Sequence, residues 1–254
     1  MLSLLLAGIL IPKVNTQSII DESWARSLVV GHRGAAAYAT ENTLPAFTEG
    51  IKAKAAAVEC DVHMSKDGVP MIMHDSTVDR TFPGIKGKVA DLQSADLIAA
   101  GVPTLEALIR HVKGKAVLII EIKGGIGVEK AVVDMVAKEK TEAETIVFSF
   151  NADYIKEVKR LNPKLFGVWL SSGGFDRTTF PKMEEKLKEI SADAIGFQFK
   201  NVNDSLASHL RYRKIPLFVW TVPPNDEVKR LKNLNVNFII TDAPRDIREI
   251  LDRS

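Results

Sequence analysis

The sequence predicts a (β/α)8 barrel, and three observations support this prediction. From Ser27 onward, short segments rich in β-branched residues alternate with longer segments of helical periodicity. Most of the short segments are continuously apolar, as expected for parallel strands that are buried on both faces. When one hairpin strand is set aside, eight strand–helix units remain, and eight units close such a barrel. An open doubly wound sheet is the alternative, but it would not need eight units.

The expected elements follow one another in regular order. The strands are expected at Leu28–Gly31, Ala57–Val62, Pro70–His74, Ala116–Ile122, Thr145–Phe150, Leu165–Leu170, Asp193–Phe197, Ile215–Thr221 and Asn237–Thr241. The helices are expected near Leu44–Lys54, Thr104–Val112, Val128–Lys138, Ala152–Leu161, Lys182–Ile190, Ser205–Arg213, Asp226–Leu234 and Pro244–Leu251. In a barrel of this kind the active site lies at the C-terminal ends of the strands.

The segment Pro70–His74 is the strand expected outside the ring. Asp67-Gly68 precedes it, and an Asp-Gly step between two short strands is typical of a hairpin turn. A reversal at this step places Glu59 opposite a residue near Asp75. We therefore expect this segment to run antiparallel beside the second strand and to bring His74 to the same rim as Glu59.

Residues 76–102 interrupt the alternation of strands and helices. They contain several turn-forming residues and one weak helix near Leu92–Ala100. We interpret them as an insertion after the second barrel strand that folds over the barrel mouth. The expected organisation is an N-terminal apolar segment at 1–26 and one barrel domain at 27–254, with the insertion at about 76–102.

The N-terminal segment leaves the compartment open. Leu2–Ile11 is a continuous apolar run that suits the core of a signal peptide but is too short to span a bilayer, which takes about 20 residues. If residues 1–20 act as a signal, the protein is secreted or extracytoplasmic, and membrane contact is expected only through this segment. If the run is a dispensable tail, the protein is cytoplasmic.

Composition excludes several classes of partner and site. The chain has 254 residues, of which 46% are hydrophobic and 26% charged, and a net charge of +2. Because acids and bases nearly balance, nothing favours nucleic acid or an anionic membrane surface, and no nucleic-acid partner is expected. The single cysteine, Cys60, excludes an internal disulfide and favours a small buried side chain. The oligomeric state is not indicated.

Charged side chains recur at the C-terminal ends of the predicted strands. They are His32 and Arg33 after the first strand, Glu59 and Asp61 on one face of the second, His74 at the end of the hairpin strand, and Glu121 and Lys123 on one face of the next barrel strand. Such groups are costly to bury alone, so they need a metal, a charged partner or solvent. Isolated ion pairs would not explain two histidines that face three acids. We therefore expect one active site at this end of the barrel.

The three acids favour a metal site. Glu59, Asp61 and Glu121 would supply oxygen ligands from neighbouring strands, and carboxylates without cysteine suit one hard divalent cation, Mg2+ or Ca2+. Zinc bound through His32 or His74 is the weaker alternative, because zinc sites take more nitrogen or sulfur ligands.

The remaining charged groups suit proton transfer and phosphate binding. His32 and His74 are the natural acid–base pair, because imidazole titrates near neutral pH. Arg33 offers a fork of donors that suits a phosphate, and Lys123 adds a charge beside the acids. His63 shares the face of the two acids on its strand, but it is expected beyond the strand end as a solvated hairpin residue.

An ordered set of motifs resembles the glycerophosphodiester phosphodiesterase family, within the phospholipase C-like superfamily of TIM-barrel phosphodiesterases. The set is His32-Arg33-Gly34, Glu41-Asn42-Thr43, Glu59-x-Asp61, Asp67-Gly68, His74-Asp75, Asp79-Arg80-Thr81, Pro103-Thr104-Leu105, Glu121-Ile122-Lys123, Trp220-Thr221 and Thr241-Asp242-x-Pro244. It extends in order and spacing from about Leu28 to the C-terminus. A lone His-Arg-Gly would be weak support, whereas the ordered set is specific.

The resemblance implies a metal-dependent enzyme that hydrolyses glycerophosphodiesters to sn-glycerol 3-phosphate and an alcohol. The roles it implies are metal binding for Glu59, Asp61 and Glu121, acid–base catalysis for His32 and His74, and substrate binding for Arg33, Lys123 and Trp220. Trp220 would line the pocket against the glycerol carbons, with a purely structural core aromatic as the alternative.

Two other functions stay open. A related enzyme, such as a lysophospholipase D or a phosphoinositide phosphodiesterase, would use the same site on lipid substrates. In that case the insertion and the N-terminal apolar segment would contact the lipid. A catalytically silent binding barrel is less favoured, because both histidines and all three carboxylates are intact.

Overall fold

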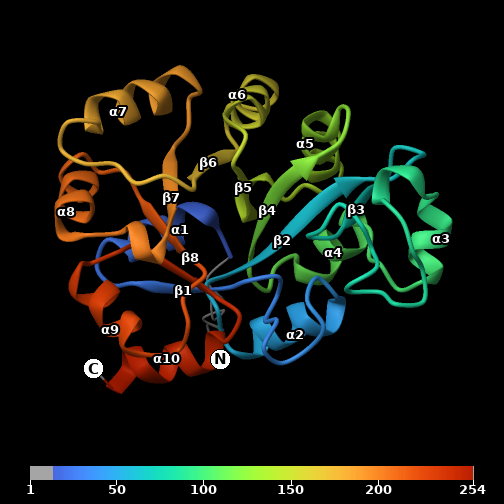
Figure 1. Cartoon of the computed structure of the whole chain (residues 1–254), viewed down its shortest axis with the longest axis horizontal. Helices are drawn as coiled ribbons and strands as arrows, with labels where there is room; N and C mark the ends of the chain where they lie inside the picture. The colour runs from blue at the N-terminus through green and yellow to red at the C-terminus, as the bar shows by residue number, and fades with distance from the viewer. Residues whose placement is uncertain (1–13, 254) are drawn as a thin grey trace, which may run out of the picture.

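Eight parallel strands close into a barrel in the computed structural model, which describes residues 14–253 (Figure 1). The strands are β1 (Leu28–Gly31), β2 (Ala57–Met64), β4 (Val117–Gly124), β5 (Thr145–Ser149), β6 (Phe166–Ser171), β7 (Ala194–Gln198), β8 (Leu217–Trp220) and β9 (Phe238–Thr241). Their order is β1-β9-β8-β7-β6-β5-β4-β2, and pairing of β1 with β2 closes the ring. The predicted (β/α)8 fold is confirmed.

Helices connect the strands and cover the outside of the barrel (Figure 1). They are α1 (Thr16–Ser23), α2 (Leu44–Lys52), α3 (Ser94–Ala99), α4 (Leu105–Val112), α5 (Val128–Glu139), α6 (Ala152–Leu161), α7 (Phe180–Glu189), α8 (Asp204–Tyr212), α9 (Asp226–Asn233) and α10 (Pro244–Arg253), with 3-10 turns η1 (Val89–Asp91), η2 (Glu142–Glu144) and η3 (Phe199–Asn201). Several helices begin at a side-chain cap that satisfies a free backbone N–H. Thr104 Oγ1 accepts from Ala107 N, for example, and Asn203 Oδ1 accepts from Leu206 N.

The inward-facing side chains of the barrel change from apolar to charged along each strand that forms the site. On β2, Ala57 belongs to the interior cluster, and the next two residues on the same face are Glu59 and Asp61. On β4, Ile119 fills the interior, and Glu121 follows it on the same face. Phenylalanine rings pack in the barrel interior, where Phe218 stacks on Phe238 and meets Phe148 edge to face, so the interior is apolar there and the charged groups lie toward the C-terminal mouth.

The outward-facing side chains of the same strands pack against the helices. Val58, Cys60 and Val62 of β2 belong to one cluster with residues of α4 and α5. Cys60 is fully buried there, as predicted. Burying an aliphatic or aromatic side chain stabilises a fold by about 1.5–3 kcal/mol. The interior cluster and the cluster between strands and helices therefore provide most of the driving force for closure of the barrel.

The hairpin strand β3 (Pro70–Ile72) runs antiparallel to β2 and lies outside the ring. Met64 pairs with Pro70 and Val62 with Ile72, which is the register expected from a turn at Asp67-Gly68. The ladder ends at Ile72, two residues before the predicted end. Met73 N still donates to Asp61 O at 2.9 Å, so the chain stays beside β2 up to His74.

The insertion after β3 has a small core of its own. Its buried side chains are Met71, Met73, Val78, Phe82, Val89, Leu97 and Val102. In Figure 1, α3 and the loops around it lie beside β3 at the edge of the barrel. The apolar side chains of the insertion pack against the β3 edge, and none of its described residues lines the cavity at the mouth.

The folded part of the chain begins earlier than the expected boundary near Ser27. Helix α1 packs against the N-terminal end of the barrel, where Ile20 joins the interior cluster. Asn237 Nδ2 donates to Ser23 Oγ at 3.1 Å and fixes the end of this helix. The predicted apolar run Leu2–Ile11 lies outside the described residues. Within residues 14–253, no helix combines the length and the apolar character that a membrane span requires.

Candidate active site

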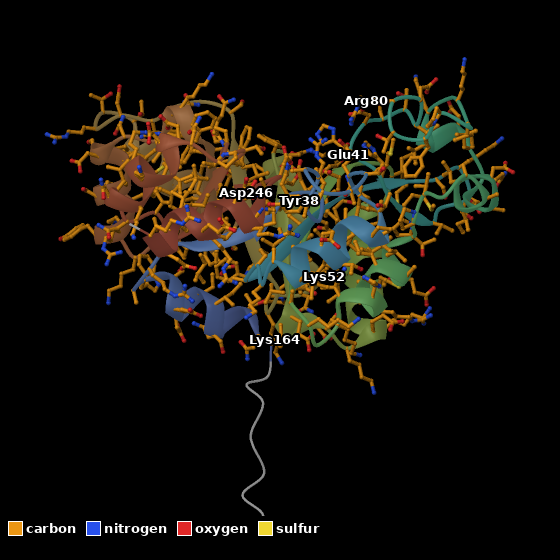
Figure 2. All side chains as sticks on the ribbon, turned by 90° about the horizontal axis from the view of Figure 1, so that it is seen from below. Tyr38, Glu41, Lys52, Arg80, Lys164 and Asp246 are labelled. Atoms are coloured by element: carbon orange, nitrogen blue, oxygen red, sulfur yellow. The ribbon has the colours of Figure 1, made fainter. Side chains whose placement is uncertain are left out.

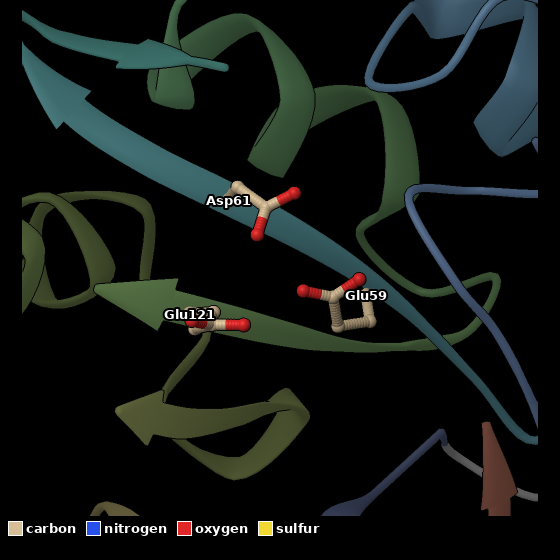
Figure 3. Close-up of side chains that lie close together, drawn as sticks. All are labelled: Glu59, Asp61 and Glu121. Atoms are coloured by element: carbon tan, nitrogen blue, oxygen red, sulfur yellow. The ribbon is translucent and has the colours of Figure 1, made fainter. Parts of the chain in front are cut away.

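Three buried carboxylates converge at the mouth of the barrel. Ligand oxygens of Glu59, Asp61 and Glu121 all lie within 4.8 Å of one another. Figure 3 shows that the first two project from β2 and the third from neighbouring β4. The parallel register pairs Asp61 with Glu121, so the acids are neighbours on the same inward face. The structure thus brings together the three residues that the sequence predicted as metal ligands.

The groups around the acids leave oxygen atoms available to a cation. Glu59 Oε2 accepts from Arg33 N at 2.9 Å, while Glu59 Oε1 has no hydrogen-bond partner within the described part of the chain. Lys123 Nζ lies 3.0 Å from Asp61 Oδ1 and 2.6 Å from Glu121 Oε1. The single positive charge of Lys123 cannot offset three carboxylates when all of them are ionised. A divalent cation would suit the negative charge that remains.

The pKa shifts of the acids reflect their crowding. Burial, together with the charges of Asp61 and Glu121, raises the pKa of Glu59 well above its usual range. Burial and the Asp61 charge raise the pKa of Glu121 to about 7. Burial also acts to raise the pKa of Asp61, but Lys123 and Arg33 outweigh it and leave that pKa lowered. The protein by itself therefore disfavours three simultaneous negative charges at this point.

Asn42 belongs to the site, although its sequence context indicated no role for it beyond membership of a motif. It is fully buried and adopts a left-handed backbone conformation, with φ of 58°. Its Nδ2 donates to Asp61 Oδ2 at 2.8 Å, and its Oδ1 accepts from Asp61 N at 3.3 Å. The side chain therefore holds both the backbone and the carboxylate of Asp61. Its place in the Glu41-Asn42-Thr43 motif was the only signal in the sequence.

Each of the two predicted acid–base histidines is held by an aspartate. His32 Nδ1 lies 2.7 Å from Asp242 Oδ1, and His74 Nδ1 lies 2.7 Å from Asp75 Oδ1. An ionised carboxylate only accepts hydrogen bonds, so Nδ1 of each ring carries the proton. Nε2 is then the nitrogen left for proton transfer. The sequence placed both aspartates in family motifs but did not reveal that they orient the histidines.

The pKa shifts of these pairs are consistent with ionised aspartates. The hydrogen bond from Arg80 holds the pKa of Asp75 well below its usual range, although burial opposes it. Burial acts to raise the pKa of Asp242, but the hydrogen bond and charge of His32 outweigh it and leave that pKa lowered. Burial lowers the pKa of His74, against the opposing charge of Asp61.

A cavity of about 170 Å³ joins these groups at the mouth. Its lining includes His32, Arg33, Glu59, His74, Glu121, Lys123 and Trp220, with Phe148, Phe150, Leu170, Thr221 and Ile240. Asp61 is fully buried and is not part of this lining. The rings of Trp220 and Phe150 meet edge to face at 5.3 Å and form an apolar part of this lining. All the predicted substrate-binding residues therefore line one cavity.

A larger cavity, of about 660 Å³, lies at the opposite end of the barrel. It is lined by residues of α1 and α10 and by the N-terminal end of β1. Its lining contains no histidine, and its acids, Glu22 and Asp252, are not part of the buried cluster of three. The residues predicted to carry the chemistry therefore gather at the smaller cavity at the mouth.

His63 was predicted to be a solvated hairpin residue, and this prediction was wrong. Its ring is half-buried, and Nε2 lies 3.1 Å from the backbone oxygen of His74. Burial lowers the pKa of His63. The hairpin continues past the last ladder pair and covers this ring, which sequence periodicity could not indicate.

A model of the Glycerophosphoryl diester phosphodiesterase family matches residues 32–246 of the chain. A glycerophosphodiester phosphodiesterase of Caldanaerobacter subterraneus subsp. tengcongensis is 30% identical over 241 residues, which cover 87% of this chain and 96% of the relative. A solved glycerophosphodiester phosphodiesterase from Thermotoga maritima is 26% identical with a TM-score of 0.72, over 88% of this chain and 98% of that one.

A second solved structure has the same fold at lower identity. The glycerophosphodiester phosphodiesterase from Agrobacterium tumefaciens has a TM-score of 0.75 at 23% identity, over 88% of this chain and 99% of that one. The motifs, the barrel and the family match agree over nearly the whole chain. The chain therefore belongs to the glycerophosphoryl diester phosphodiesterase family of enzymes.

Proposed function

We propose that this enzyme hydrolyses glycerophosphodiesters to sn-glycerol 3-phosphate and an alcohol, with one divalent cation, Mg2+ or Ca2+. The observation that carries this proposal is the convergence of three buried carboxylates and two aspartate-held histidines on one cavity of about 170 Å³. Membership of the family supports the reaction.

Glu59, Asp61 and Glu121 would hold the cation. Their oxygens are hard ligands, lie within 4.8 Å of one another and include an oxygen of Glu59 that accepts no hydrogen bond within residues 14–253. When bound, the cation would supply positive charge to offset the charge that builds on the phosphate.

Arg33 and Lys123 are suited to the phosphate. Arg33 Nη1 pairs with Glu41 at 2.8 Å, while Arg33 Nε makes no hydrogen bond within the described residues and lies 3.6 Å from Asp61 Oδ2. Arg33 also lines the cavity at the mouth, so its remaining guanidinium donors could bind a phosphate oxygen there without loss of the Glu41 anchor. Trp220 and Phe150 offer an apolar surface to the glycerol carbons.

His32 and His74 would move the protons. One imidazole removes the proton of the glycerol 2-hydroxyl, which attacks phosphorus, while the other protonates the departing alcohol oxygen. Water then opens the cyclic phosphate diester, with the two histidines in exchanged roles. The Nδ1–H of each ring is held by an aspartate, so Nε2 is presented to the substrate in either step.

The test is an activity panel with glycerophosphocholine, glycerophosphoethanolamine, glycerophosphoinositol and lysolipids, at increasing Mg2+ or Ca2+, with coupled detection of sn-glycerol 3-phosphate. We expect metal-dependent release of this product from the water-soluble diesters. A lysophosphatidic acid or a cyclic inositol phosphate as the main product would instead support the lipid-cleaving alternatives. An absence of turnover across the panel would support a silent barrel.

Substitution of the histidines tests the mechanism. His32→Gln and His74→Gln should each lower the rate by about 10²-fold or more, as is typical when general acid–base catalysis is lost. His111→Gln is the matched control, because His111 lies on α4, where its Nε2 contacts Thr48 Oγ1 at 3.0 Å, and does not line the mouth. Near-normal rates in both site variants would disprove the acid–base assignment.

A further inference from the structure

We propose that Arg80 is a positioning residue that fixes the orientation of the His74 imidazole at the mouth. The insertion lies at the edge of the barrel, and through Arg80 it would then also hold a residue of the active site in place. This inference rests on the proposed function of the mouth, but an NMR measurement that does not depend on activity also tests it.

The guanidinium of Arg80 bridges two carboxylates. Its Nε lies 2.6 Å from Asp75 Oδ2, its Nη1 lies 2.9 Å from Glu41 Oε2, and its Nη2 lies 2.6 Å from Glu41 Oε1. Figure 2 shows Arg80 beside Glu41 at the same rim of the barrel. A planar fork with several donors can hold two carboxylates at a set distance, which a single ammonium group cannot do.

Each of the two carboxylates in turn holds a residue of the mouth. Asp75 Oδ1 lies 2.7 Å from His74 Nδ1, and Glu41 Oε1 lies 2.8 Å from Arg33 Nη1. Five side chains therefore form one chain of contacts in the order Arg33, Glu41, Arg80, Asp75, His74. Arg80 is its central member, and it links the phosphate-binding arginine to the proton-transferring histidine.

The backbone of Arg80 is fixed by the core of the insertion. Val78 and Phe82, two residues to either side, are both buried in that core. Phe82 N donates to Val78 O at 2.9 Å, and Val78 N donates to Gly87 O at 3.0 Å. Gly87 N also donates to Asp79 Oδ2 at 3.1 Å. These contacts hold the Arg80 backbone in place, while its side chain points to the barrel.

His74 needs such support more than His32 does. His32 follows β1, which is paired on both sides within the ring, and its backbone N donates to Thr241 O at 2.8 Å. His74 lies two residues beyond β3, a three-residue strand at the end of the sheet order, whose ladder is with β2 and whose other side makes only an isolated bridge, between Met71 and Thr104, within the described residues. Backbone pairing therefore restrains His74 less than it restrains His32. A side-chain contact that holds the ring of His74 consequently has more effect.

Stability is not the main role of these contacts. The Arg80 side chain is 51% exposed, and ion pairs at exposed positions contribute little to folding. The geometry instead favours an effect on orientation, because the Asp75 carboxylate selects the ring tautomer of His74 and Arg80 holds that carboxylate. Loss of Arg80 should therefore reduce turnover much more than thermal stability.

The chain contains a matched control far from the mouth. Arg213 Nη2 lies 2.6 Å from Glu184 Oε2, and Glu184 Oε1 lies 2.8 Å from His209 Nε2. This is the same order of arginine, carboxylate and histidine, with 49% exposure of the Arg213 side chain. Glu184 and His209 belong to the outer helices α7 and α8, and none of the three lines the mouth.

The test compares Arg80→Ala, Arg80→Lys and Arg213→Ala for kcat, KM and Tm on glycerophosphocholine with saturating metal. We expect Arg80→Ala to lower kcat by about 10-fold or more, the range typical for loss of a partner that orients a site histidine, with a smaller change in KM. Arg80→Lys should recover only part of this loss. Arg213→Ala should change Tm about as much and leave kcat unchanged.

The second measurement is the tautomer of His74 by 15N NMR of the imidazole rings, with the signal identified by its absence in His74→Gln. We expect the proton on Nδ1 in the wild-type enzyme and a mixture of tautomers in Arg80→Ala. A wild-type kcat together with a wild-type His74 signal in Arg80→Ala would overturn the proposal. So would an equal loss of kcat in Arg213→Ala. If the wild-type enzyme hydrolyses no diester, the proposed function fails, whereas the NMR result still decides the role of Arg80.

Discussion

The Oδ1 atom of Asp242 lies 2.7 Å from Nδ1 of His32, although 210 residues separate the two in the chain. The contact exists because β1 and β9 are neighbours in the ring, with Gly31 paired to Thr241. Closure of the barrel therefore creates one of the two aspartate–histidine pairs. The other pair, His74 and Asp75, is formed by adjacent residues.

Asp242→Asn should lower kcat by about 10²-fold or more with a smaller change in KM. An amide can donate to Nδ1 and so stabilise the tautomer in which Nε2 carries the proton, which is the wrong state for a base. The measurement is steady-state kinetics at saturating metal. Asp226→Asn is the control, because that side chain is 97% exposed on α9. Equal activity of the two variants would show that His32 does not depend on Asp242.

Glu121→Gln should abolish the stabilisation of the protein by Mg2+ or Ca2+. A ligand present at 100 times its Kd stabilises the native state by about 2.7 kcal/mol, and we expect the wild-type Tm to rise accordingly. In EDTA, the variant should be no less stable than the wild type, because burial and Asp61 raise the pKa of Glu121 to about 7 and already disfavour its charge.

The measurement for this prediction is thermal unfolding in EDTA and at increasing metal concentration. Glu157→Gln, on α6 and paired with Arg160, is the control and should keep the full metal response. A metal-dependent rise in Tm that survives in Glu121→Gln would place the cation elsewhere.

Gly31→Ala should destabilise the fold and reduce activity together. A Cβ at this position would lie 2.0 Å from the backbone oxygen of Gly34, and a backbone atom cannot yield as a flexible side chain can. Overpacking of this kind costs about 1–3 kcal/mol or more, and it would displace the adjacent His32. At Gly84, in the insertion, a Cβ would meet nothing within 4 Å.

The measurement is urea unfolding and kcat for both alanine variants. Gly84→Ala should stay within about 0.5 kcal/mol of the wild type, as surface substitutions usually do. If Gly31→Ala changed neither the stability nor kcat, the close approach of Gly31 to the backbone of Gly34 would not be needed to position the site.

The contribution of Asp67 to stability should depend on pH in the acid range. Hydrogen bonds from Ser94 and Ser65 lower the pKa of Asp67 to about 2, so the folded state binds its proton less readily than the unfolded chain does. The stabilisation is therefore present above about pH 4 and is lost as the pH falls toward about 2. The hydrogen bonds between Asp67 and Ser94 link the hairpin turn to α3 of the insertion.

The measurement is the urea midpoint of the wild type and Asp67→Asn at pH 6, 4 and 3. The variant should be less stable at pH 6, and the difference should narrow as the pH falls. A difference that stays constant over this range would mean that the ionisation of Asp67 does not stabilise the fold.

Much of the fold and of the site could be predicted from local patterns. The apolar segments and the helical periodicity between them indicated eight units, and the Asp67-Gly68 step indicated the β2–β3 register that the structure shows. Alternation along a strand placed Glu59 and Asp61 on one face before any tertiary contact was known. These features depend on residues that are close in the sequence, where backbone geometry dictates which side chains share a face.

The sequence by itself determined the type of barrel and identified the acids and histidines that we propose to hold a cation and to move protons. Only the tertiary structure decided the orientation of those side chains: the partnership of Asp242 with His32, the bridge of Arg80 between Asp75 and Glu41, and the burial of His63. The physical reason is that Asp242 reaches His32 only when the ring closes, Arg80 reaches Glu41 only when the insertion packs on the barrel edge, and His63 is covered only when the chain after β3 stays beside β2. Periodicity along one strand contains no information about such distant pairs.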